Sequence, residues 1–193
     1  MLLASVAAAS LVQASHAVYY GFSTLEWTAK GLSGSVIGAL WALGVAAEIV
    51  LFLLSARLPS ALGPRMLLLI GAAGAVVRWG AMALDPPLIL LLPVQCLHAL
   101  SFGASFLGAV QFLARIAPDG EAATAQAYFS TLQGIVMAAA TGISGVLYGN
   151  FGALAYAAMA ACAAVGGIVI LSGISNRESG IRYQGSKTNS PDT

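Results

Sequence analysis

Long stretches without a charged residue constrain this chain more than any other feature of its sequence. There is no Asp, Glu, Lys or Arg between residues 2 and 25, between residues 86 and 114, or between Glu121 and Arg177. A helix that crosses a membrane needs about 20 predominantly apolar residues. Only 8% of the residues are charged, against about a quarter in a soluble domain, and the mean hydropathy is +0.89. The sequence therefore predicts an all-α integral membrane protein and excludes both a soluble domain and a disordered chain.

Six membrane-spanning helices account for these stretches. Asp85-Pro86-Pro87 is expected to end one span, because proline supplies no amide donor and disfavours a helical conformation in the residue before it. The run after Glu121 must hold two spans, and we expect its turn at residues 148–152, which contain two glycines and an asparagine. Within a bundle over residues 1–175, the predicted spans are residues 2–25, 35–55, 66–84, 88–114, 122–148 and 153–174. Residues 176–193, rich in Ser, Gly and Asn, are predicted to form a disordered cytoplasmic tail.

The basic residues are distributed unevenly between the loops on the two sides of the membrane. Cytoplasmic loops of membrane proteins carry an excess of Lys and Arg. If both termini are cytoplasmic, the outer loops contain only Lys30. The inner segments then contain Arg57, Arg65, Arg115, Arg177, Arg182 and Lys187. We therefore expect both termini to lie in the cytoplasm.

Several functional classes are excluded by composition and spacing. A net charge of +1 leaves no basic patch that would bind nucleic acid. Cys96 and Cys162 lie in apolar runs, so we interpret them as small hydrophobic residues and not as a disulfide or a metal pair. Residues 142–145 have the Gly-x-Ser-Gly form of an intramembrane serine protease, but both histidines precede this serine, whereas such proteases place the base in a later helix. With no phosphate loop or zinc spacing either, we expect neither an enzyme nor a bound cofactor or metal.

Three ionisable residues lie inside the predicted spans, at depths where a charge is expensive. A charged side chain near the membrane centre costs about 2.5 to 3.5 kcal/mol on insertion scales, so such residues are functional candidates. Glu48, Arg78 and His98 lie in the second, third and fourth spans, each roughly 5 Å from the midplane at a rise of about 1.5 Å per residue. The heights of Glu48 and Arg78 differ by about 9 Å, which is within the combined reach of two side chains.

Two interpretations of this constellation are open. In the first, Glu48 and Arg78 form an ion pair that fixes helix packing. In the second, the three residues couple transport to protons. The proton affinity of a carboxyl group in an apolar bundle depends on a nearby guanidinium, so a movement of Arg78 would load or release a proton on Glu48. His98 would take part because imidazole titrates near neutral pH.

Uncharged polar residues recur at helical spacing in three of the spans. Steps of three and four residues place side chains on one face of a helix. The stripe of the first span is Gln13, His16, Tyr20, Ser23 and Trp27, that of the fourth is Gln95, His98, Ser101 and Ser105, and that of the fifth is Gln126, Ser130, Gln133, Met137, Thr141, Ser144 and Tyr148. Polar faces of this kind occur where helices pack against each other in lipid and also along water-filled paths. The stripes do not distinguish between these two interpretations.

Four short segments occur in a particular order along the chain. They are residues 16–23 (HAVYYGFS), residues 38–48 (GALWALGVAAE), residues 77–79 (VRW) and residues 95–98 (QCLH). Their order and spacing resemble the carboxy-terminal six-helix half of a major facilitator superfamily transporter of the phenylpropionate permease type, which is related to the lactose permease group. Six spans with both ends inside agree with this resemblance across the rest of the chain.

The resemblance implies a permease of the bacterial inner (plasma) membrane that carries a small organic, plausibly aromatic, acid together with protons. Glu48, Arg78 and His98 match the places of the glutamate, arginine and histidine that carry the coupling. One turn after the histidine, where lactose permease has a second carboxylate, this chain has Ser101. The expected substrate-binding residues are His16, Tyr20, Trp27, Trp41, Gln95, Gln126 and Gln133, with Trp79 as a further aromatic surface.

The superfamily builds its central cavity from two six-helix halves. We therefore expect the partners of this chain to be the lipid bilayer, protons, a small-molecule substrate, and either an amino-terminal six-helix half or a second copy. The alternative is a six-helix membrane scaffold, or a remnant of a longer protein, without transport activity of its own.

Overall fold

The computed structural model describes residues 2–59, 62–118 and 120–187, and side chains from Val6 to Ser172 within those ranges. Every regular element in this part of the chain is helical. The long helices are α1 (Leu2–Ala14), α2 (Ala17–Ala29), α3 (Gly34–Leu54), α4 (Pro64–Ala83), α5 (Leu88–Cys96), α6 (Ser105–Ile116), α7 (Ala122–Phe151) and α8 (Ala155–Lys187). Short 3-10 turns occupy Ser55–Arg57 and Gly152–Leu154, and a π-helical turn occupies Ala99–Ala104.

Four segments in the described ranges are long and apolar enough to cross a membrane. They are Gly34–Arg57, Pro64–Ala83, Leu88–Ile116 and Ala122–Ser172. The last segment contains both α7 and α8, which are separated at Gly152, where a φ of +54° suits a residue without a Cβ atom. The break coincides only with the last residue of the predicted turn at 148–152, because α7 continues to Phe151. These segments make the chain an integral membrane protein.

The first predicted span, residues 2–25, is not one continuous helix in the structure. It is divided into α1 and α2, each of 13 residues and therefore too short to cross a bilayer alone. The break has a local cause, because the side chains of Ser15 and His16 bond to the carbonyl oxygens of Val12 and Gln13, three residues earlier. Such local bonds compete with the regular helical pattern.

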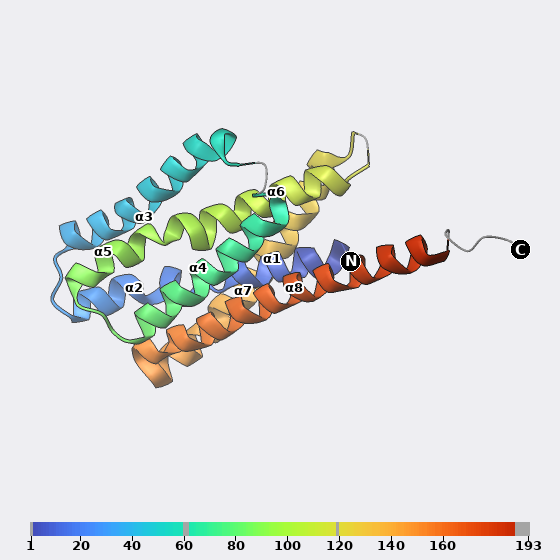
Figure 1. Cartoon of the computed structure of the whole chain (residues 1–193). Helices are drawn as coiled ribbons and strands as arrows, with labels where there is room; N and C mark the ends of the chain where they lie inside the picture. Colours follow the sequence, from blue (N-terminus) through green and yellow to red (C-terminus); the bar gives the residue numbers. More distant parts are fainter. Residues whose placement is uncertain (1, 60–61, 119, 188–193) are drawn as a thin grey trace, which may run out of the picture.

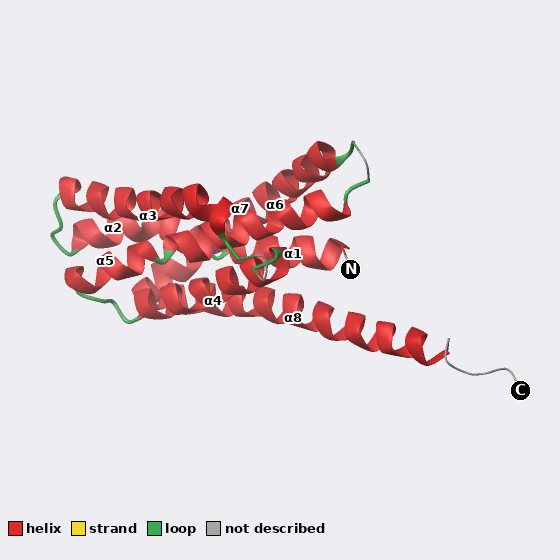
Figure 2. Ribbon diagram, turned by 45° about the horizontal axis from the view of Figure 1, so that its top comes forward, coloured by secondary structure: helices red, strands yellow, loops and turns green. Residues whose placement is uncertain are grey.

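Helix α8 continues past residue 174, where we expected the last span to end. It runs to Lys187 and extends beyond the other helices (Figure 2). The reason is visible in the sequence, since no proline occurs between Pro118 and Pro191 to stop the helix. The predicted tail therefore overlaps helix over residues 176–187, and residues 188–193 lie outside the described residues.

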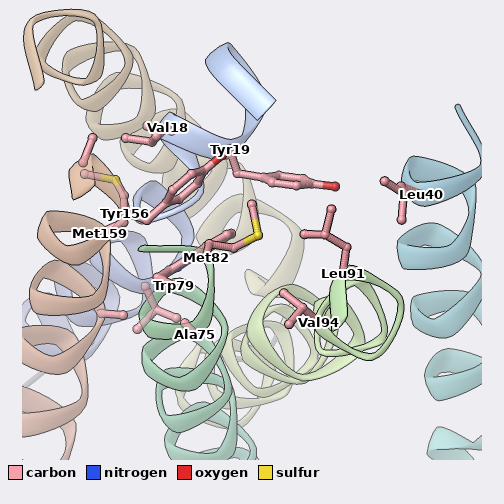
Figure 3. Packing of buried hydrophobic residues seen from close by; sticks show 14 of the residues in the cluster. Val18, Tyr19, Leu40, Ala75, Trp79, Met82, Leu91, Val94, Tyr156 and Met159 are labelled. Atoms are coloured by element: carbon pink, nitrogen blue, oxygen red, sulfur yellow. The ribbon is translucent and has the colours of Figure 1, made fainter. Parts of the chain in front are cut away.

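Helix α4 occupies the middle of the bundle (Figure 1). It packs along α8 on one side and along the π-helical turn and α6 on the other, while α1 packs between α7 and α8. The core where these helices meet contains Tyr19, Trp79, Met82, Leu91, Val94, Tyr156 and Met159 (Figure 3). Because lipid is as apolar as these side chains, close packing, and not exclusion of water, holds such helices together in a membrane.

Close packing of α4 against its neighbour depends on glycines. A Cβ atom on Gly74 would lie 2.7 Å from Cβ of Leu100, and one on Gly108 would lie 2.7 Å from the carbonyl oxygen of Pro64. The absence of side chains at these two positions lets α4 approach the π-helical turn and α6 directly. This approach fixes the distance between the residues that the two helices present to each other.

Candidate functional site

The three ionisable residues of the predicted spans meet in the bundle. The His98 Nε2 atom lies 3.3 Å from Oε2 of Glu48, and the Arg78 Nη1 atom lies 2.8 Å from Nδ1 of His98. Glu48 comes from α3, Arg78 from α4, and His98 from the residue before the π-helical turn. Among the described residues, Glu48 and Arg78 make no direct ion pair, because the imidazole ring of His98 fills the space between them.

The hydrogen bonds define where the proton of His98 lies. A guanidinium group only donates, so Nδ1 of His98 must accept from Arg78 and carries no hydrogen. A neutral imidazole then carries its hydrogen on Nε2, which donates to the carboxylate of Glu48. The three side chains thus form one directed series of hydrogen bonds, from Arg78 through His98 to Glu48.

Arg78 is enclosed by polar and aromatic groups. Its Nη2 atom donates to Oε1 of Gln95 at 3.0 Å, and Nη1 also donates to Oγ of Ser101 at 3.3 Å. The ring centroids of Tyr19 and Trp79 lie 4.4 and 4.7 Å from its central carbon. The side chain is fully buried. A bound anion therefore cannot reach Arg78 in this conformation, whereas the Glu48 side chain keeps 16% exposure.

The helix α3 approaches His98 through Gly44. A Cβ atom on Gly44 would lie 3.4 Å from Cβ of His98, in van der Waals contact, so the backbone of α3 lies close to this residue. Glu48 follows Gly44 by four residues and therefore lies on the same face of α3. A small residue one turn away thus allows the carboxylate of Glu48 to reach the imidazole.

An aromatic surface lies beside this series of hydrogen bonds. The rings of Tyr20 and Trp41 stack with centroids 6.0 Å apart and an interplanar angle of 23°, and Tyr20 also stacks on His16 at 5.6 Å. Tyr20 is 40% exposed and Trp41 is partly exposed. The indole nitrogen of Trp41 donates to Thr24 at 3.2 Å, which fixes the ring. This surface can stack against the face of a planar ligand.

The predicted substrate-binding residues fall into three groups in the structure. Tyr20 and Trp41 form the exposed aromatic surface, while His16 and Gln95 are fully buried and hydrogen-bonded within the polar cluster. Trp27 is fully buried in the hydrophobic core against Tyr19. The remaining two, Gln126 and Gln133, are partly exposed on α7 and make no hydrogen bond to any of these residues in the described ranges.

Tyr19 is a part of the site that sequence reasoning missed. Its hydroxyl donates to Oε1 of Gln95 at 2.8 Å, and its ring contacts the guanidinium of Arg78. Tyr19 follows His16 by three residues, so helical spacing would have placed both on one face. The predicted stripe runs instead through Tyr20, which follows His16 by four residues.

A second charged cluster lies at the end of α2. Lys30 forms ion pairs with Glu26, at 2.7 Å, and with Asp85 in the turn before α5. Partial burial favours the neutral amine of Lys30, but the hydrogen bonds that Lys30 donates to Asp85 and Glu26 outweigh this effect and raise the pKa of Lys30 above the ordinary value. Glu26 itself is only 5% exposed. Among the described carboxylates, Glu26 is thus more deeply buried than Glu48.

Comparison with known proteins adds two findings. The family model described as "MFS_1 like family" matches residues 2–158. The chain is also similar to the "Probable 3-phenylpropionic acid transporter" of Escherichia coli (strain K12), with 40% identity over 148 residues, which are 76% of this chain and 39% of that protein. The chain thus spans about two fifths of the length of this curated relative. No solved structure matches the chain.

Proposed function

This chain belongs to the MFS_1 like family of the major facilitator superfamily, and from this premise we propose that it is the carboxy-terminal half of a proton-coupled symporter for a small organic acid. The series of hydrogen bonds from Arg78 through His98 to Glu48 carries this proposal. A buried cation that is separated from its carboxylate by an imidazole ring is a costly arrangement in a membrane. We infer that the protein keeps this arrangement because the contact forms and breaks when a proton is released or bound.

Proton binding in this arrangement falls first to Glu48. The free lone pair of neutral His98 already accepts from Arg78, so His98 cannot take up a proton unless Arg78 moves away. Glu48 has an exposed edge and, among the described residues, accepts a hydrogen bond only from His98 Nε2. Protonation of Glu48 removes its charge and weakens the charge-assisted bond to His98. The ring is then free to turn, which releases Arg78.

The substrate surface in this proposal is the pair Tyr20 and Trp41. A ring of an aromatic acid stacks on these side chains, and its carboxylate lies towards His98 and Glu48. Because a substrate carboxylate and an ionised Glu48 repel each other, binding of the anion requires a protonated Glu48. The relative's name, a probable 3-phenylpropionic acid transporter, suggests the class of acid. Gln126 and Gln133 complete the cavity only when a second half faces α7.

The same proposal assigns six spans with both termini in the cytoplasm of a bacterial inner membrane. The broken helices α1 and α2 together form the first span, and α7 and α8 form the fifth and sixth. Single-cysteine labelling in intact cells tests this topology. Lys30→Cys should react with an impermeant reagent from outside, whereas Arg115→Cys should react only after the membrane is opened. External labelling at position 115 would contradict the topology.

A second six-helix half is the partner we propose. Alternating access needs two bundles that move against each other around a central site. Helix α7 buries only Phe129 and Ser144, and α3 exposes apolar residues along its length, so both helices have faces that the described chain leaves uncovered. These faces would be covered by the amino-terminal half.

Reconstitution tests the proposed function directly. The chain is placed in liposomes alone and together with the amino-terminal six helices of the E. coli relative, and uptake of labelled 3-phenylpropionic acid is measured under an imposed pH gradient. We expect uptake driven by the gradient only when both halves are present. Absence of uptake with both halves, although both are folded and inserted, would contradict the proposal. Robust uptake by a demonstrated monomer of this chain would contradict the need for a partner.

A further inference from the structure

Two irregular segments of helix lie next to each other in the bundle. One is the junction of α1 and α2 at Ser15 and His16, and the other is the π-helical turn Ala99–Ala104. Irregular turns of this kind inside helices are frequent at functional sites. His98, the middle member of the series of hydrogen bonds, immediately precedes the π-helical turn. The position of that turn therefore decides where the imidazole lies.

The side chain of Gln13 bonds to the turn from the neighbouring helix. Its Nε2 atom donates to Oγ of Ser105 at 3.0 Å and to the carbonyl oxygen of Phe102 at 3.4 Å. The hydroxyl of Ser105 in turn bonds to the carbonyl oxygens of Ser101 and Phe102. Gln13 thus helps to satisfy carbonyl groups of the irregular turn, and its own side chain is 1% exposed.

His16 holds the same turn at a second point. Its Nδ1 atom must donate, because its partner is the carbonyl oxygen of Gln13, so a neutral ring leaves Nε2 as an acceptor. The hydroxyl of Ser101 donates to this Nε2 atom at 3.2 Å and accepts from Arg78. The Phe102 ring stacks on His98 with centroids 5.2 Å apart and meets His16 edge-on.

Relaxation of the turn would move His98. A π-helical turn closes its hydrogen bonds at i→i+5, one residue further than an α-helix. Conversion to α-helix would therefore rotate the segment before the turn relative to α6 by about 100°, the rotation of one residue at 3.6 residues per turn. Because Gly108 locks α6 against the start of α4, α5 and His98 would rotate. His98 would then leave both Glu48 and Arg78.

We propose that Gln13 and His16 are positioning residues, which hold the π-helical turn and thereby keep His98 between Glu48 and Arg78. His16 is then not a substrate ligand but the end of a second series of hydrogen bonds, from Arg78 through Ser101. The consequence for transport rests on the proposed proton coupling, whereas the positioning itself does not. One consequence is independent of transport, namely that the two histidines carry opposite tautomers, Nε2–H in His98 and Nδ1–H in His16.

Nitrogen-15 NMR of the full chain in lipid bilayers tests this proposal, because the sequence has only 2 histidines. Wild type should show one ring in each tautomer. Gln13→Met keeps the length of the side chain but removes its N–H groups. In this variant His98 should no longer show the signal of the Nε2–H tautomer alone. Ser10→Ala is the matched control, since Ser10 is buried in α1 and its hydroxyl has no partner among the described residues. It should leave both signals unchanged.

A second variant guards against misfolding of Gln13→Met. His16→Phe keeps an aromatic ring and leaves His98 as the only histidine, so its tautomer is read without assignment. We expect the same loss of the single-tautomer signal. A His98 that carries its hydrogen on Nδ1 in wild type, or remains wholly Nε2–H in the folded variants, overturns the positioning role. A changed His98 signal with no proton-linked uptake in wild type contradicts the proposed function instead.

Discussion

The chain contains two charged clusters that are built from similar groups and organised differently. At the end of α2, Lys30 contacts the carboxylates of Glu26 and Asp85 directly. Deep in the bundle, the cation of Arg78 reaches its carboxylate only through His98. Direct ion pairs neutralise opposite charges without an intervening group. A cation and a carboxylate joined by a titratable ring form a contact that protons can make or break.

The two clusters also differ in their exposure to water. Lys30 is partly exposed at the end of a helix, where water and salt weaken its ion pairs. Arg78 is fully buried, with the rings of Tyr19 and Trp79 against its guanidinium and hydrogen bonds to Gln95, His98 and Ser101. The comparison therefore predicts that the inner cluster controls both folding and transport, and that the outer cluster contributes only modest stability.

The largest expected effect is that of Arg78→Ala. Removal of the guanidinium leaves Nδ1 of buried His98 without a donor, takes one of two donors from Gln95, and removes the cation that balances Glu48. Breaking such a buried network costs about 3 to 5 kcal/mol. Thermal unfolding in detergent and proton-driven uptake should both show the loss. Arg78→Lys should not restore uptake, because a lysine cannot donate in the fork geometry of arginine. A variant as stable as wild type would contradict the account.

Gly74→Ala should have an intermediate effect, because it acts on the inner cluster through helix spacing. The new Cβ atom would lie 2.7 Å from Cβ of Leu100, so α4 must move away from the π-helical turn. Overpacking of this kind costs about 1 to 3 kcal/mol. Gly80→Ala on the same helix is the control, since a Cβ atom on Gly80 would meet nothing within 4 Å. Equal melting temperatures for the two variants would refute the close approach.

The smallest expected effect is that of Asp85→Asn in the outer cluster, because Asp85 is exposed whereas Glu26 is nearly buried. We expect a loss of about 0.2 to 1 kcal/mol, typical of exposed ion pairs, and unchanged uptake. The pKa of Lys30 is raised, so its ion pairs stabilise the protein fully below the ordinary value of about 10.4. That stability is lost as the pH rises through the higher folded-state pKa. Wild type should therefore lose it at alkaline pH, and Asp85→Asn, which lacks one of the two ion pairs, should show a smaller loss.

The sequence predicted which ionisable residues come together better than it predicted how they are joined. Charge-free runs identified membrane helices, and Glu48, Arg78 and His98 stood out because each interrupts an apolar span. Helical spacing assumes a regular α-helix, and so it predicted neither the π-helical turn nor the break at Ser15 and His16. At both irregularities side chains bond to backbone carbonyls, and apolar runs do not reveal such bonds.

The aromatic residues show the same limit of pattern reasoning. Trp27 and Tyr20 share one helical stripe, yet Trp27 is fully buried in the core and Tyr20 is 40% exposed. Which part of a stripe is covered depends on the neighbouring helices, here α7 and α8, and not on the stripe itself. Gln126 and Gln133 remain predictions, because within the described residues both are partly exposed and neither bonds to another predicted site residue.

The central claim, that protons act through Glu48, is tested most directly by Glu48→Gln in membrane vesicles with an imposed pH gradient. A glutamine is permanently neutral and mimics the protonated carboxyl group. We therefore predict that this variant, paired with the amino-terminal half, retains exchange of 3-phenylpropionic acid across the membrane but loses accumulation against a gradient. Proton-driven accumulation of unchanged magnitude in Glu48→Gln would contradict the account.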